Sequence, residues 1–161
     1  MRLSTRGRYA VMALVEMAAR EGRAEGCVNG RPVTLNDIAA AQQLSVAYLE
    51  QLFGRLRRAG LVASARGPGG GYRLARPAKA IPIAEIVEAA DEPIVATRCE
   101  EGGPGCLGGG TRCLTHDLWA ELGDQIRLFL GAMTLADVVD GHVIGRARPP
   151  AGPEAAITPA P

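Results

Sequence analysis

The chain has 161 residues, of which 47% are hydrophobic and 4% aromatic, and its formal net charge is +1. This length accommodates one domain with an aliphatic core, and no apolar run reaches the roughly 18 residues that span a bilayer, which excludes a transmembrane protein. The first four residues lead directly into a helical pattern, so we expect no cleavable leader and a cytoplasmic location.

The small net charge hides an uneven distribution of basic residues. Between Glu50 and Glu85 the sequence has no acidic residue, and three arginines precede the first acidic residue, Glu16. The basic residues of the acid-free stretch are Arg55, Arg57, Arg58, Arg66, Arg73, Arg76 and Lys79. Clustering of one sign predicts a face that binds a polyanion, with a solvated charged surface as the simpler alternative.

An amphipathic helix is predicted over residues 9–19, because apolar residues recur there at helical spacing. Its expected core residues are Val11, Leu14, Val15 and Ala18. Residues 21–32 are rich in glycine and charge and are interpreted as a surface loop, in which Cys27 has no neighbouring ligand.

Two short helices joined by a tight turn are predicted next. Thr34 and Asp37 form a capping box for the first helix, Ser45 caps the second, and Gly60 suits its end. The apolar stripe of the second helix consists of Leu49, Leu52, Phe53 and Leu56. This pattern predicts a helix-turn-helix whose second helix enters the major groove, against the alternative of an ordinary helical hairpin.

A β-hairpin is predicted directly after the second helix. Residues 61–66 and 72–74 favour strands, and the glycine-rich run 67–71 turns the chain between them. A hairpin in this place makes the unit a winged helix, with Arg66 near the wing tip positioned for the minor groove. The glycine run lacks the lysine and the strand-to-helix setting of a phosphate-binding loop.

Helices are also predicted after the wing. The first opens at Ile81-Pro82-Ile83 with the proline in its first turn, and a long amphipathic helix follows over residues 116–133. The stripe of the long helix consists of Leu118, Leu122, Ile126, Phe129 and Met133, widened by Trp119 and Leu130. So wide a stripe predicts a dimerisation helix, with packing on its own domain as the alternative. A capping box at Thr134 and Asp137 starts a last short helix.

Four candidate metal ligands lie between the wing and the long helix. Cys99, Cys106, Cys113 and His116 follow the pattern C-x6-C-x6-C-x2-H, with spacers rich in glycine. Spacers of this kind bury little apolar surface, so we expect a metal centre to order the segment. Three cysteines and a histidine suit either structural zinc or an iron–sulfur cluster, and a disulfide is disfavoured in the cytoplasm. No motif supports catalysis, so we expect no enzyme activity and no small-molecule substrate.

Three stretches carry a resemblance to a known family: MRLSTRGRYAVMAL, LSVAYLEQLFGRLRRAGLVASARGPGGGY and ATRC…GC…CLTHDLW. From residue 1 to about Val139 the chain resembles the IscR-type winged-helix regulators, which sense iron–sulfur clusters. The resemblance implies a homodimer that binds double-stranded operator DNA and controls genes of cluster biogenesis as repressor and activator. It implies a [2Fe–2S] cluster on Cys99, Cys106, Cys113 and His116, with Zn²⁺ or [4Fe–4S] as alternatives. The expected DNA contacts are Ser45, Ala47, Tyr48, Glu50, Gln51, Arg55 and Arg66.

The sequence departs from the family in two places. Each six-residue ligand spacer is one residue longer than the usual five, and residues 25–30 look like an insertion in the first loop. A nitric-oxide-sensing branch with a three-cysteine cluster is an alternative, although the CLTH ending disfavours it. The expected fold is mainly α with a small β-hairpin. The expected divisions are 1–80 for DNA binding, 81–98 as connection, 99–116 for the cluster, 117–144 for dimerisation, and 145–161 as a disordered tail.

Overall fold

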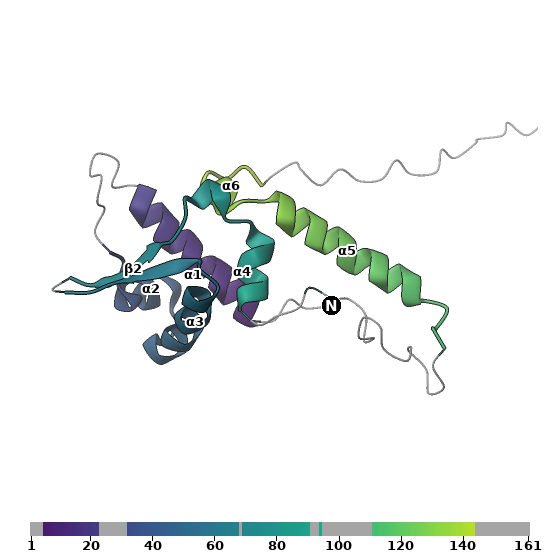
Figure 1. Ribbon diagram of the computed structural model, residues 1–161, viewed down its shortest axis with the longest axis horizontal. Helices are drawn as coiled ribbons and strands as arrows, with labels where there is room; N and C mark the ends of the chain where they lie inside the picture. The colour runs from purple at the N-terminus through teal and green to yellow at the C-terminus, as the bar shows by residue number, and fades with distance from the viewer. Residues whose placement is uncertain (1–4, 23–31, 68, 91–93, 95–110, 144–161) are drawn as a thin grey trace, which may run out of the picture.

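The computed structural model describes residues 5–22, 32–67, 69–90, 94 and 111–143. The elements in chain order are α1 (Thr5–Gly22), α2 (Leu35–Gln42), α3 (Val46–Arg58), β1 (Val62–Ala65), β2 (Gly71–Leu74), the 3-10 helix η1 (Ala78–Ala80), α4 (Ile83–Ala89), α5 (His116–Ala132) and α6 (Leu135–Val139). This mainly helical chain with one small antiparallel hairpin confirms the predicted fold class. Figure 1 shows α1 to α4, the hairpin and α6 gathered together, with α5 extending away from them.

The helix-turn-helix forms as its local sequence predicts. Thr34 Oγ1 accepts from the backbone N–H of Asp37 and the Asp37 carboxylate accepts from that of Thr34, which completes the capping box of α2. Gln43 ends α2 with a φ of 54°, a left-handed conformation that lets the chain reverse within three residues. Ser45 Oγ then accepts from the backbone N–H of Tyr48 and starts α3.

The wing is an antiparallel pair whose register runs from Val62 opposite Leu74 to Ala65 opposite Gly71. Its turn contains Gly67 and Gly69, both with positive φ, as a tight reversal of this kind requires. The strands lie within one residue of their predicted bounds. The hairpin packs beside α3, so recognition helix and wing form one continuous unit.

One apolar core joins elements from both ends of the chain. Phe53, Leu14, Met17, Ile38 and Leu135 are all fully buried in it. Residues from α4, α6 and the end of α5 therefore complete the core of the helix-turn-helix unit. The face of α1 was only partly predicted: Leu14 and Ala18 are buried, but Val11 and Val15 are half-buried. The remaining buried positions of α1 are Gly7, Ala10, Ala13 and Met17.

Two further elements differ from expectation at their ends. Glu21, expected in a loop, lies in the last turn of α1, and its carboxylate accepts a 2.9 Å hydrogen bond from the backbone N–H of Leu74. Pro82 is the N-cap of α4 rather than a residue of its first turn. The backbone of the segment before α4 bonds to the junction of α5 and α6, with Ile83 N–H to Met133 O and Leu135 N–H to Ile81 O, both 2.8 Å.

Candidate nucleic-acid interface and ligand-bearing segment

The recognition helix α3 has one buried and one exposed side. Leu49, Leu52, Phe53 and Leu56 pack into the core, as predicted. The opposite side, which we call the reading face, consists of Ala47, Glu50, Gln51, Gly54 and Arg58, spaced so that they share one side of a helix. Glu50 and Gln51 are exposed, and a side chain added at Gly54 would meet nothing within 4 Å. Arg58 belongs to this face although the sequence analysis did not select it.

Ser45 and Tyr48 lie at the start of α3 with structural partners of their own. Ser45 is exposed, and its hydroxyl oxygen caps the helix. Tyr48 is half-buried and meets the ring of Tyr9 edge-on, with ring centroids 5.8 Å apart. This contact fixes the orientation of the Tyr48 ring beside the reading face and ties the start of α3 to α1.

Arg55 lies at the flank of α3, between the reading face and the core. Its side chain is half-buried, and Nη1 donates to the backbone oxygen of Ala90, the C-cap of α4, at 3.5 Å. Among the predicted DNA contacts, Tyr48 meets α1 and Arg55 meets the end of α4.

The wing is fixed to the helix-turn-helix by backbone hydrogen bonds. Val33 N–H donates to Tyr72 O at 2.9 Å, and Tyr72 N–H donates to Val33 O at 2.8 Å. Gly71 lies so close to the backbone of Val33 that a Cβ added to Gly71 would lie 2.5 Å from Val33 O. Arg66 follows β1 and is exposed at the distal side of the wing.

Four basic residues of the acid-free stretch separate into two groups. Arg57, Arg58 and Arg66 are exposed along α3 and the wing. Arg76 instead pairs with Glu85 of α4 at 2.5 Å and also donates to Ala80 O at 3.4 Å. The exposed group gives this side of the molecule a positive surface that suits a phosphate backbone.

The ligand-bearing segment meets α5 at its first residue. His116 begins the helix, and its backbone N–H donates to Cys113 O at 3.0 Å. Cys113 has a free, half-exposed thiol whose sulfur lies 3.6 Å from Thr115 Oγ1. Cys99 and Cys106 lie outside the described residues, as does Cys27. Within the described part of the chain, no group of three or more potential metal ligands is assembled.

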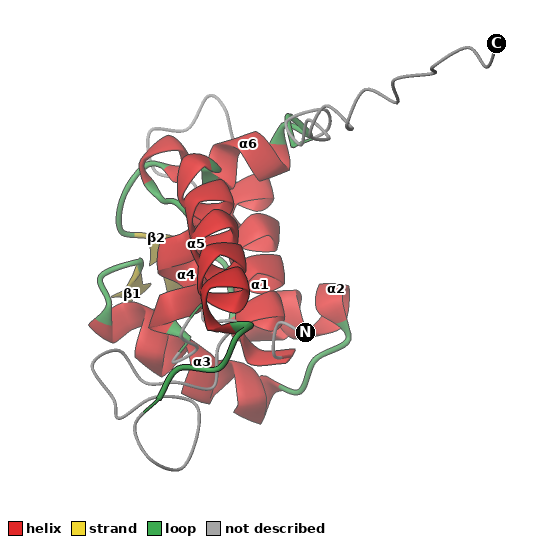
Figure 2. Cartoon of the chain, turned by 90° about the vertical axis from the view of Figure 1, so that its right-hand side faces the viewer, coloured by secondary structure: helices red, strands yellow, loops and turns green. Residues whose placement is uncertain are grey.

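The exposed side of α5 carries a line of large apolar residues. Leu118, Trp119, Leu122 and Phe129, which we call the apolar stripe, are exposed by 63%, 44%, 38% and 41%. Ile126 and Leu130 are half-buried and Met133 is buried, so the predicted stripe divides between solvent and the protein's own core. Helix α4 contacts α5, and Figure 2 shows α5 lying in front of the other helices.

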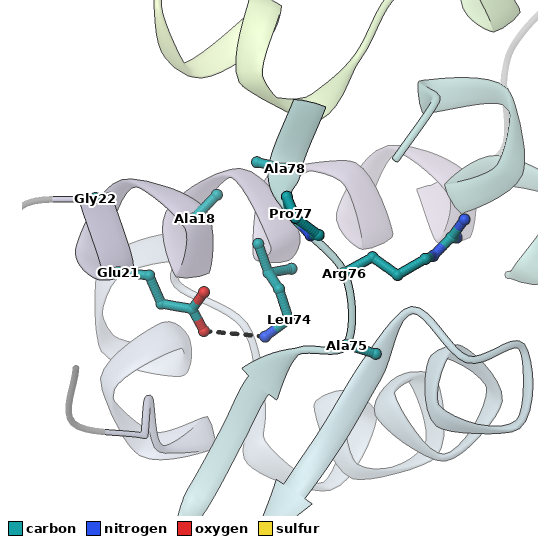
Figure 3. Close-up of a pocket in the computed structure, with 8 residues that line it drawn as sticks. All are labelled: Ala18, Glu21, Gly22, Leu74, Ala75, Arg76, Pro77 and Ala78. Carbon is teal, nitrogen blue, oxygen red and sulfur yellow. Dashed lines mark hydrogen bonds between the residues drawn. The ribbon is translucent and has the colours of Figure 1, made fainter. Parts of the chain in front are cut away.

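A pocket of about 430 Å³ opens where the end of α1 meets the base of the wing. Figure 3 shows Glu21 at one side, bonded to the Leu74 backbone, and Arg76 directed away from it. The remaining lining consists of Leu74 and of alanine, glycine and proline residues, and none of the predicted site residues takes part. We therefore assign the pocket to the packing of α1 against the wing and not to the candidate functional site.

Comparison with known proteins places this arrangement in a family. The model of the Rrf2 family, described as iron-dependent transcriptional regulators, matches residues 3–141. An HTH-type transcriptional regulator IscR from Yersinia pseudotuberculosis is 49% identical over 144 residues, which are 89% of this chain and 82% of that protein. The IscR of Xenorhabdus nematophila is 51% identical over 146 residues, with the same shares covered.

Solved structures show the same fold. CymR, the global cysteine regulator of B. subtilis, matches with a TM-score of 0.70 and 32% identity over 88% of this chain and 98% of that one. IscR of T. potens matches with a TM-score of 0.67 and 33% identity over 88% of both chains. In the described part of this chain, no helix combines the length and apolar character needed to cross a membrane.

Proposed function

Because this chain belongs to the Rrf2 family of iron-dependent transcriptional regulators, we propose that it reads operator DNA as a homodimer under the control of a [2Fe–2S] cluster. That it is a DNA-binding transcriptional regulator follows from the family itself. The proposal adds which residues read DNA, how two copies pair, and what the cysteines hold. It also assigns a cytoplasmic location and a role in binding rather than catalysis.

The observation that carries the DNA-reading proposal is the exposed reading face of α3 beside the wing. Glu50 and Gln51 are exposed on a helix whose opposite side is packed into the core. Their side chains are therefore available to contact base edges in the major groove. Ser45, Ala47 and Tyr48 lie at the N-terminal end, where recognition helices approach DNA. Glu50 accepts hydrogen bonds from the cytosine amino group and repels phosphate, so it discriminates between sites.

Arg66 on the wing is proposed to enter the minor groove. An arginine is attracted by the strong negative potential of narrow A·T-rich segments. The backbone bonds between Val33 and Tyr72 hold the wing at a fixed position relative to the start of α2. The two reading elements therefore approach one duplex as a rigid pair.

The apolar stripe of α5 supports the homodimer. Large apolar side chains exposed along one helix are costly in water, and pairing with the same stripe of a second copy buries the four residues of the apolar stripe. A two-fold pairing also places two copies of α3 on two half-sites, which is how helix-turn-helix dimers read palindromic operators.

The described ligand residues fit a thiolate-bound centre. Cys113 is a free thiol three residues before the start of α5, and cysteine sulfur is a preferred ligand of both iron–sulfur clusters and zinc. His116, three residues on, places a nitrogen donor within the first turn. We propose that Cys99, Cys106, Cys113 and His116 hold a [2Fe–2S] cluster, which supplies reversible one-electron chemistry when bound.

The location of these ligands supports a link to DNA reading. His116 is the first residue of α5 and Cys113 lies three positions before it, so a metal centre held by both would be attached to the start of the proposed dimerisation helix. The orientation of α5 in turn sets the separation of the two α3 helices in a dimer. By likeness to the relatives named IscR, we propose that the regulated genes are those of iron–sulfur cluster biogenesis.

The test begins with anaerobic purification, followed by visible absorption and EPR spectra and assays of iron, sulfide and zinc in one sample. Brown protein with about two iron and two sulfide per monomer supports the cluster. A [4Fe–4S] cluster would give about four of each. Colourless protein with one zinc would show that residues 99–116 hold a structural zinc site, and that the winged helix binds DNA constitutively.

Binding to DNA is then compared with and without the cluster. A duplex is selected from a randomised pool by the purified protein, and its affinity is measured over a series of salt concentrations. We expect a palindromic site, and different affinities for the loaded and cluster-free protein. Equal affinity of the two forms for every selected site would refute the sensing model.

A further inference from the structure

Helix α4 is bonded at its start to the end of α5. Ile83 N–H donates to Met133 O, and Leu135 N–H donates to Ile81 O, both at 2.8 Å. Because these are backbone hydrogen bonds, they join the start of α4 to the junction of α5 and α6 without the help of side chains. The helix that begins at the ligand residues is thereby attached to α4.

The end of α4 meets the recognition helix. Ala90, its C-cap, is completely buried, and its backbone oxygen lies 3.5 Å from Arg55 Nη1. Carbonyl groups at a helix C-terminus have no partner within the helix, and a cation there is favoured by the helix dipole. A half-buried guanidinium directed at this end is therefore well placed to hold α3 and α4 together.

The position of Arg55 on α3 supports this role over contact with DNA. It lies one turn beyond Gln51, at the edge of the reading face, but its side chain is half-buried whereas those of Glu50 and Gln51 are exposed. Arg57 and Arg58, at the end of the same helix, are exposed. Helix α3 thus carries one arginine directed at the protein and two exposed to solvent.

We propose that Arg55 is a positioning residue that fastens the recognition helix to the C-terminal end of α4. Helix α4 then connects α5 to α3, with a backbone attachment at its start and the Arg55 attachment at its end. This inference rests on the proposed function, since it names the side chain through which the orientation of α5 reaches the reading face. Its effect on DNA binding is indirect.

The first measurement needs no DNA. The backbone N–H of Ala90 donates to Ile86 O and Val87 O, both at 3.2 Å, so its hydrogen exchange reports the integrity of the α4 C-terminus. Arg55→Gln should speed the exchange of this amide, whereas the matched variant Arg57→Gln removes the same charge from α3 and should leave it as in wild type. Unchanged exchange in Arg55→Gln would overturn the proposed attachment.

The second measurement separates positioning from phosphate contact. With the cluster-free protein on its selected duplex, Arg55→Gln should weaken binding by about two- to tenfold, the effect of one lost hydrogen bond. The slope of log affinity against log salt should stay at the wild-type value, because no phosphate contact is removed. Arg55→Lys has a shorter side chain and should not restore affinity.

The opposite results would overturn the inference. A slope smaller by about one, or full restoration by lysine, would identify Arg55 as a phosphate contact. In the cluster-loaded protein, Arg55→Gln should bring the affinities of loaded and cluster-free forms closer together, and Arg57→Gln should not. Circular dichroism and molar mass confirm that each variant is folded and in its wild-type oligomeric state. If wild-type protein selects no duplex at all, the proposed function fails, whereas the exchange result still decides the attachment.

Discussion

Val33 and Tyr72 exchange a pair of backbone hydrogen bonds, 2.9 and 2.8 Å long, that join the wing to the residue before the N-cap of α2. The wing is therefore extended by a third segment of backbone rather than projecting as a lone hairpin. Isolated two-stranded hairpins are marginally stable in water, so this bridge gives the wing a defined position.

Gly71 should be essential to this bridge. An added Cβ would lie 2.5 Å from Val33 O and 2.8 Å from Val33 C, and both are backbone atoms that cannot turn aside. We expect Gly71→Ala to lower the free energy of unfolding by about 1–3 kcal/mol, the usual cost of overpacking. Urea unfolding followed by circular dichroism measures it.

Gly54→Ala is the matched control for this prediction. Gly54 lies inside α3 with nothing within 4 Å of an added Cβ, so the alanine should raise the free energy of unfolding by about 0.5–1 kcal/mol. Opposite signs for the two variants are expected. Equal effects would mean that the wing does not approach Val33 as closely as described.

Arg66→Ala should weaken DNA binding most at sites with A·T-rich flanks. The arginine is exposed beside the wing turn, and narrow minor grooves attract such side chains. Fluorescence anisotropy on duplexes that differ only in their flanks measures the effect. Lys79→Ala, which removes an exposed cation from η1, should not change the preference for flanks. An unchanged preference in Arg66→Ala would remove the wing from the reading mechanism.

Phe129→Glu should convert the proposed dimer into monomers. Phe129 is 41% exposed on the apolar stripe of α5, and a carboxylate buried between two copies would have no partner. Light scattering after gel filtration gives the mass, and DNA affinity should fall with it. Leu128→Glu adds the same charge about 100° around the helix, away from the stripe, and should remain dimeric. If Leu128→Glu were monomeric and Phe129→Glu dimeric, the interface would lie on the side of α5 that carries Leu128 instead of on the apolar stripe.

Cys113→Ala should abolish the cluster while leaving a folded protein. Its side chain is half-exposed at the start of α5 and contributes nothing to the core, so circular dichroism should be unchanged. The visible absorption and the bound iron and sulfide should be lost. Cys27 is outside the proposed ligand set, so the Cys27→Ala protein should keep the visible absorption and the bound iron and sulfide. An unfolded Cys113→Ala protein would favour a structural centre over a sensing one.

The sequence alone was enough to predict the starts of α2, α3 and α6, because their capping hydrogen bonds join residues that are close along the chain. Both capping boxes, at Thr34 with Asp37 and at Thr134 with Asp137, join residues three positions apart. Ser45 caps α3 over the same separation. A donor and an acceptor so close along the chain have few possible arrangements, so the residue types suffice to predict them.

Only the tertiary structure decided how these elements are fastened together. Arg55 meets Ala90 across 35 positions, and Glu21 meets Leu74 across 53. The sequence analysis placed Glu21 in a loop and named no partner within the protein for Arg55, because neither partner is near in the chain.

The buried face of α1 was decided in the same way. Ala10, Ala13 and Met17 are buried beyond the predicted stripe, because α1 packs against helices on several sides. The buried stripe of α3 could be predicted from the sequence, since it depends on local spacing. Long-range partners depend on how helices pack, and the angles and distances of that packing are set by the whole core at once.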